Sequence, residues 1–256
     1  MAVTASGKDK LLKDARIYVG GYDLSGDALS VSSLDFAYGS ADVTGWSESV
    51  RNFISSSRVT TGIQGFQALM NDSTGQAWDR LKNDVDRDTQ LTFGFGGGGS
   101  PAVGDPAYHL PSIAMDDVMS MTGNRAVLAT SFLFDSSQYT GNFIKPLGVI
   151  LRGDTSLGAT LTASSTNSVD FEAIQSGNTG WTAIIHILAT SSGNFAITVK
   201  DSSDDSSFST IGTFTTTGGS VGAELISGTD TVERYVAFDA QRTAGSITAI
   251  VSFVRN

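Results

Sequence analysis

The placement of proline constrains the fold of this chain more than any other feature. All four prolines lie between Pro101 and Pro146, so the C-terminal part has none. Proline lacks the N–H that an internal strand donates to its neighbour. A long proline-free region rich in Gly, Ser and Thr is therefore typical of short strands joined by tight turns. This pattern predicts a mainly β protein.

Short runs of alternating apolar and polar residues fill the C-terminal part. In residues 195–200 the side chains of Phe195, Ile197 and Val199 fall on one face of a strand. Eight such strands favour a β-sandwich, of which a jelly roll is one form. They are expected over residues 158–163, 169–174, 181–190, 195–200, 208–215, 223–226, 234–239 and 246–254.

The N-terminal part predicts a sheet-rich domain of two small sheets with one packed helix. Strands are expected over residues 16–19, 30–36, 57–70, 89–95 and 125–134. Gly and Pro indicate a long loop over 96–111, and residues 135–153 are expected to link two domains. The domains expected are residues 1–150 and 151–256.

The helix is expected over residues 73–85, with Ser73 or Asp72 as its N-cap. Helical spacing then places four apolar residues on one side of it, which favours packing against the sheet. They are Ala77, Trp78, Leu81 and Val85.

Composition excludes much chemistry. The chain has no Cys and two His, so disulfides, thiolate metal sites and cysteine nucleophiles are excluded. We expect both histidines to be structural, His186 as a hydrogen-bonded strand residue and His109 as a loop residue. No GxSxG motif is present. We therefore expect no enzymatic activity, no metal and no cofactor.

Three acidic or glycine-rich segments fall short of a ligand site. Residues 94–99 read GxGxxG, but no helix pattern follows to receive a phosphate. Residues 84–88 open like a calcium loop, yet Thr89 and Phe95 stand where Gly and Glu are required. Asp201, Asp204 and Asp205 are interpreted as part of a hairpin loop.

The net charge of −10 leaves too few basic residues to hold a run of phosphates. Residues 183–189 form the longest apolar stretch, which is too short for a membrane span, and the N-terminus does not read as a secretory signal. We expect a soluble protein made in a cytoplasm.

Two pairs of segments resemble proteins of tailed viruses. Residues 15–26 (ARIYVGGYDLSG) and 42–54 (DVTGWSESVRNFI) resemble the start of the major tail proteins of long-tailed bacteriophages. In those proteins a V-N-G-x-D-L-S strand precedes V-T-x-[FW]-x-x-x-x-[RK]-x-F. Residues 194–208 and 233–238 are similar to β-sandwich modules of virion structural proteins, although Lys200 replaces a usual Gln and Ala237 a second Arg.

The resemblance implies a tail-tube-like N-terminal domain that assembles into stacked hexameric rings in the virion tail. Its partners would be further copies of the chain, other tail proteins, and viral DNA that passes through the channel without specific binding. An acidic channel would repel that DNA. Synthesis would take place in the host cytoplasm.

The isolated apolar residues Trp46, Phe53 and Ile54, flanked by Gly and Ser, occur in the second part of the first motif. So short a segment cannot bury them by itself, and we expect residues 37–53 to form an extended arm that neighbouring subunits order. The residues expected at this subunit interface are Asp42, Trp46, Glu48, Arg51, Phe53 and Ile54.

Two other interpretations stay open. A capsid decoration or turret protein would use the same sandwich module, and a trimer or pentamer would favour it. A carbohydrate-binding receptor module or a glycosidase would need an exposed aromatic platform or a carboxylate pair. Trp46, Trp78 and Trp181 are too scattered to indicate such a platform.

Overall fold

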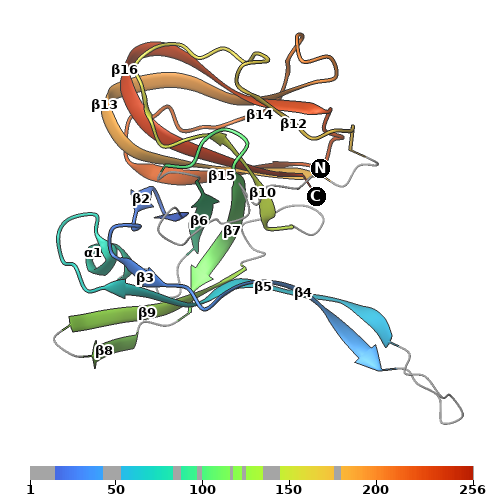
Figure 1. Ribbon diagram of the computed structural model, residues 1–256. Helices are drawn as coiled ribbons and strands as arrows, with labels where there is room; N and C mark the ends of the chain where they lie inside the picture. The colour runs from blue at the N-terminus through green and yellow to red at the C-terminus, as the bar shows by residue number, and fades with distance from the viewer. Residues whose placement is uncertain are drawn as a thin grey trace, which may run out of the picture.

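The computed structural model describes residues 15–42, 53–82, 88–96, 100–115, 118–122, 125–134, 145–175 and 180–255. In these residues the protein is mainly β: one curled, antiparallel sheet runs through the molecule, with a single short helix against it (Figure 1). The elements are β1 Ala15–Val19, β2 Tyr22–Asp23, β3 Ala28–Ser30, β4 Ser33–Asp42, β5 Phe53–Leu69, α1 Ala77–Leu81, β6 Asp88–Phe95, β7 Pro106–Ala114, β8 Val118–Thr122, β9 Arg125–Phe134, β10 Leu147–Arg152, β11 Ser156–Leu157, β12 Ser168–Asp170, β13 Trp181–Ser202, β14 Ser209–Thr213, β15 Gly222–Gly228 and β16 Tyr235–Arg255.

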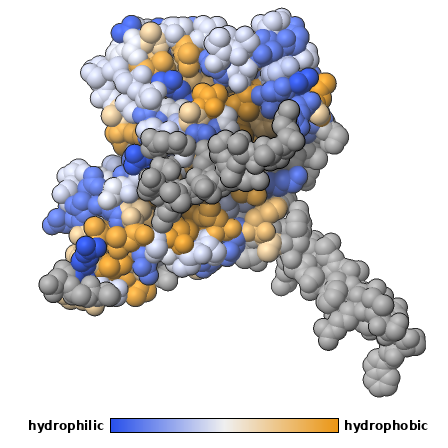
Figure 2. Space-filling view, viewed as in Figure 1, coloured by the Kyte–Doolittle hydropathy of each residue, from blue (hydrophilic) through white to orange (hydrophobic). Residues whose placement is uncertain are grey.

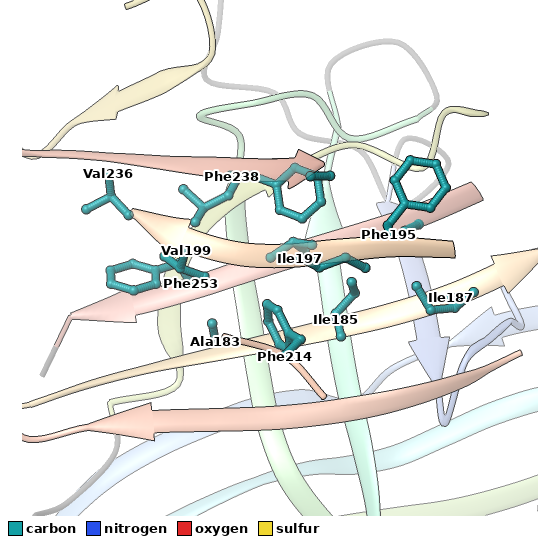
Figure 3. Packing of buried hydrophobic residues seen from close by; sticks show 14 of the residues in the cluster. Ala183, Ile185, Ile187, Phe195, Ile197, Val199, Phe214, Val236, Phe238 and Phe253 are labelled. Atoms are coloured by element: carbon teal, nitrogen blue, oxygen red, sulfur yellow. The ribbon is translucent and has the colours of Figure 1, made fainter. Parts of the chain in front are cut away.

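Two large hydrophobic clusters lie in different parts of the chain. The N-terminal cluster is built from β1, β5, β6, β7, β9 and α1, and includes Phe66, Leu91 and Phe132. The C-terminal cluster is built from residues after position 148 and includes Ile197 and Phe253 (Figure 3). Each cluster is a contiguous set of buried apolar side chains.

The strands between the clusters are buried on both faces. In β1, Ile17 and Val19 join the N-terminal cluster, whereas Tyr18 points the other way. In β13, Ala183 and Ile185 join the C-terminal cluster, whereas His186 belongs to the opposite face. These opposite faces meet in a layer that we call the seam. It consists of Tyr18, Thr92, Ala107, His109, Ile150, Thr182, His186, Leu188, Ile250 and Ser252.

The long antiparallel pair of β13 and β16 replaces four of the eight strands expected in the C-terminal part. The two strands pair from Trp181↔Arg255 to Ser202↔Tyr235, and the pairing is interrupted by bulges near residues 187–195. Ser192 (φ 50°) and Gly245 (φ 65°) adopt left-handed conformations there. Because bulges bend strands, the pair of β13 and β16 curls, and both halves of β13 contribute to one cluster (Figure 3). The sandwich and jelly-roll topologies stay predictions.

The prediction of a loop over residues 96–111 is wrong for its second half, because residues 106–111 belong to β7. Proline misled the prediction, because Pro106 is the first residue of the strand and Pro111 lies within it. On the side away from β6, β7 pairs with β10 up to Tyr108 and with β9 from Ser112 onward. Pro111 therefore falls where the strand changes partners, and its missing N–H costs no bond on that side.

The helix is shorter than expected and is capped differently. α1 covers Ala77–Leu81, and its N-cap residue Gln76 makes no side-chain capping bond. Neither Ser73 nor Asp72 is the cap. Instead, the buried carboxylate of Asp27 accepts a hydrogen bond from the Ala77 N–H at 3.0 Å. This cap lies far away in the chain, so local capping patterns could not reveal it. Val85 lies outside the described residues.

β10 joins the two parts of the sheet. It pairs with β7 at Tyr108 and with β16 at Phe253, in the second half of the segment expected to be a linker. The expected linker is therefore partly a strand. The domain boundary at residue 150 falls inside this strand and stays a prediction.

Candidate functional site

The most conspicuous feature of the surface is a two-stranded arm. β4 and β5 pair from Ser33↔Gln64 to Asp42↔Phe53. Among the described residues, only β4 pairs with residues 53–60 of β5, because β9 begins to pair at Gly62. The two strands project away from the rest of the molecule, as Figure 1 shows at the lower right. The arm thus places backbone far from either cluster.

The residues expected at a subunit interface fall on this arm or outside the described residues. Asp42, Phe53 and Ile54 lie in the paired strands, with Asp42 opposite Phe53. Trp46, Glu48 and Arg51 lie outside the described residues. Their role at an interface stays a prediction.

A region of five strands in the sheet continues from the base of the arm. Its order is β3 and β4 beside β5, then β9, then β8. In the described part of the chain, β8 pairs with β9 alone and β3 and β4 pair with β5 alone. Both edges of this sheet therefore present unpaired backbone groups, which can pair with strands of another chain.

One of these edges is strongly apolar. On β8, Val118 is 52% exposed, Met119 58% and Met121 84%. Met119 lies opposite Leu128, which is fully buried in the N-terminal cluster. Since residues opposite each other share a face of the sheet, Met119 and Met121 extend the core face beyond the core. Figure 2 shows apolar residues at the lower left, around β8 and β9.

The seam contains a buried hydrogen-bond network that includes both histidines. His109 Nδ1 lies 2.9 Å from Ser252 Oγ, and His109 Nε2 lies 2.8 Å from Thr182 Oγ1. His186 Nε2 lies 3.0 Å from Thr92 Oγ1, whose oxygen lies 3.0 Å from Ser252 Oγ. His186 is thus a hydrogen-bonded strand residue, as expected. His109 is not a loop residue, because it lies in the middle of β7.

The network brings a serine and a histidine together, which the sequence had not indicated. A His–Ser pair is the geometry of nucleophilic catalysis when a substrate can reach it. Here His109 is fully buried and Ser252 is 1% exposed. Burial also lowers the pKa of both imidazoles to about 3, so both rings are neutral near pH 7. The contact between His109 and Ser252 therefore links β7 to β16 inside the seam. The absence of enzymatic activity stays a prediction.

The acidic segments do not form a metal site in the described residues. No group of three or more His, Cys, Asp or Glu side chains is placed there to hold an ion. Asp201 is buried and accepts the Glu233 N–H at 2.9 Å. Asp204 accepts the N–H groups of Ser206 and Ser207, which lowers its pKa. Asp204 and Asp205 lie in the loop of a hairpin formed by β13 and β14, as expected, whereas Asp201 lies in β13, opposite Ser209.

Two further features were considered as sites. A cavity of about 260 Å³ beside β1 and β3 is lined mainly by apolar side chains, and Arg16 is the one charged residue of its lining. Within the described residues, no helix is long and apolar enough to cross a membrane. The open-edged sheet and its arm are therefore the candidate functional site.

Comparisons with known proteins found a weak structural likeness to a solved structure. No protein-family model matches the sequence, and no curated protein matches it. Among solved structures, the chain is similar to a crystal structure of the SPP1 Dit (gp 19.1) protein, described as a paradigm of the hub adsorption apparatus in Gram-positive infecting phages. The identity is 12% and the TM-score 0.34, over 94% of this chain and 99% of that chain. A likeness of this size supports no conclusion about function.

Proposed function

We propose that this protein is a structural component of a bacteriophage tail that assembles with copies of itself into rings. In the full proposal the rings contain six copies and stack into a tube around a channel for DNA. The viral setting and the number six come from the two segments that resemble tail and virion proteins. Self-assembly is supported by one observation: in the described residues, this region of the sheet is open at both edges and carries an arm.

The two edges of this sheet are different surfaces. β8 forms one edge, and β3 with β4 forms the other. If the β8 edge of one copy meets the β3–β4 edge of the next, the contact is head-to-tail, and such contacts close into a ring when the rotation permits. Closure pairs the unpaired backbone groups of every copy and removes the aggregation hazard of an open edge.

The side chains of β8 favour this contact. The neighbouring copy would cover Met119 and Met121, both of which are largely exposed in the single chain. Removing their apolar surface from water would stabilise the contact. Methionine is flexible and adapts to irregular surfaces, so it suits a contact between subunits. The arm would add to it, since residues 53–60 extend about 25 Å at the rise of a β-strand.

The experiment compares purified wild-type protein with single-residue variants by mass measurement in solution and negative-stain imaging. We expect wild-type rings or tubes, and monomers for Met121→Lys, because a lysine at a buried contact carries an unpaired charge. Ile174→Lys is the matched control. Ile174 is 53% exposed and lies in the C-terminal part, so this variant should assemble normally.

Three outcomes would contradict the proposal. A wild-type protein that stays monomeric at every concentration would refute self-assembly, and normal assembly of Met121→Lys would refute the role of β8. A trimer or a pentamer would overturn the tail-tube proposal in favour of a capsid decoration or turret protein.

A further inference from the structure

The hydrogen bonds of the seam have a direction that one backbone group imposes. The Gly21 N–H donates to His186 Nδ1 at 3.2 Å. A backbone N–H can only donate, so His186 Nδ1 must accept and the proton of the neutral ring is on Nε2. His186 Nε2–H then donates to Thr92 Oγ1, 3.0 Å away. His186 is therefore a neutral ring of one defined tautomer.

The direction continues through the hydroxyl groups to the second histidine. With its oxygen already accepting, Thr92 can donate to Ser252 Oγ, and Ser252 can donate to His109 Nδ1. His109 Nε2–H then donates to Thr182 Oγ1 at 2.8 Å. A chain in which every group both accepts and donates is strengthened by mutual polarisation. It starts in the turn between β1 and β2, passes through β13, β6, β16 and β7, and returns to β13 at Thr182.

No carboxylate faces either imidazole in the described residues. The four partners of the two rings are one backbone N–H and three hydroxyl groups. The tyrosine nearest to them, Tyr18, has its ring centre 6.0 Å from that of His186 and donates to Asp154. The ionisable side chains on the elements packed against the seam are otherwise Arg16 on β1, Tyr22 and Asp23 on β2, Asp88 on β6, Tyr108 on β7, Arg152 on β10, Lys200 and Asp201 on β13, Glu224 on β15, and Tyr235, Asp239, Arg242 and Arg255 on β16.

We propose that the two histidines form a pH-sensitive latch, which holds the facing layers of the curled sheet together at the seam while both rings are neutral and lets the seam open when the rings are protonated, while β10 still pairs with β7 and β16. Protonated His186 has a proton on Nδ1, so two donors face each other at Gly21. Among the described residues no carboxylate bonds to either ring, so the buried charges are costly in the closed seam.

The seam opens before either cluster unfolds, because it is the layer in which the protons must bind. The N-terminal and C-terminal clusters contain no histidine. In the closed form the pKa of each ring lies near 3, whereas an exposed imidazole has a pKa near 6.5. The open form therefore binds more protons between these values, and the closed form loses stability as the pH falls from about 6.5 towards 3. Lowering the pH from 8 to 5 raises the ratio of open to closed molecules about 30-fold for each histidine.

The first test is a nitrogen-15 NMR titration of the wild-type protein labelled at histidine. The chain has two histidines, so the spectrum contains two residues. At pH 7.5 we expect the Nε2–H tautomer for both rings, without titration around pH 6.5. Rings that titrate near pH 6.5 in the closed protein, or an Nδ1–H tautomer at His186, would overturn the proposal.

The second test measures hydrogen exchange of the full chain at pH 8 and pH 5, corrected for intrinsic rates. Protection should fall in β6 and β7, which contribute Thr92 and His109 to the seam, and persist in β9, which contributes no residue to it. The double variant His109→Gln/His186→Gln has amides that do not titrate and should lose this response. The control Asp154→Asn should keep it. Loss of protection in all strands together, or an unchanged response in the glutamine variant, would refute the latch.

Discussion

Removing the two hydroxyl groups at the centre of the seam should show that they act together. Thr92 Oγ1 contacts His186 Nε2 and Ser252 Oγ, and Ser252 Oγ also contacts His109 Nδ1. Both side chains are almost fully buried, at 0% and 1% exposure. A hydrogen bond lost inside the seam is therefore not replaced by a bond to water. The donor or acceptor that is left without a partner destabilises the fold, because it has also lost its hydration.

The expected magnitudes follow from the number of groups left without a partner. Thr92→Val leaves the Nε2–H of His186 unpaired, and Ser252→Ala leaves Nδ1 of His109 unpaired. Each single variant should lower the free energy of unfolding by about 1 to 3 kcal/mol, since that is the cost of an unsatisfied buried group. The bond between Thr92 and Ser252 is lost in both singles. The double variant should therefore be about 1 kcal/mol less destabilised than the two singles predict together.

Equilibrium denaturation with urea at pH 7.5 measures these free energies for the full chain. Thr130→Val is the control, because Thr130 is also buried at 2% exposure and its hydroxyl has no hydrogen-bond partner in the described residues. This variant should cost nothing or stabilise the protein slightly. If the effects of Thr92→Val and Ser252→Ala add within about 0.3 kcal/mol, the two hydroxyl groups are not coupled and the continuous chain of bonds is refuted.

Two further stability predictions concern the C-terminal cluster and the turn beside the seam. Ile197 is fully buried, so Ile197→Ala should lower the free energy of unfolding by about 2 to 5 kcal/mol and Ile197→Val by about 0.5 to 1.5 kcal/mol; equal losses would mean that the site is not tightly packed. Gly21 has φ +93°, and a Cβ there would lie 2.5 Å from the backbone of Gly222, so Gly21→Ala should destabilise strongly in thermal unfolding. Gly26→Ala, with no atom within 4 Å of its Cβ, should leave the melting temperature unchanged or raise it, and a similar loss for both variants would contradict this explanation.

Strands with clear alternation could be predicted from the sequence, whereas strands that break the usual rules could not. Residues 125–134 were expected to be a strand and form β9 with those bounds. β7 was missed because proline within it suggested a loop, and only the change of partner strands makes Pro111 acceptable. β8 was missed because it is five residues long, and its apolar side chains carry no strong signal by themselves.

The candidate assembly surface was partly visible in the sequence. Isolated apolar residues between glycines indicated an arm, and β4 and β5 pair as far as Asp42 and Phe53. The open edge at β8 was not visible. An edge is defined by the absence of a neighbouring strand, and strand order depends on pairings between distant segments that periodicity does not encode.

What the sequence determined by itself is the alternation along each strand, and with it which side chains of a strand share a face. It contains Thr92 between Leu91 and Phe93, and His186 between Ile185 and Ile187, so polar side chains on the second face were readable. Only the tertiary structure decided that these second faces meet. Thr92 and Ser252 are 160 positions apart, and their contact exists because β6 packs beneath the sheet of β13 and β16. A buried polar side chain requires a partner, but which partner it finds depends on how the sheets stack.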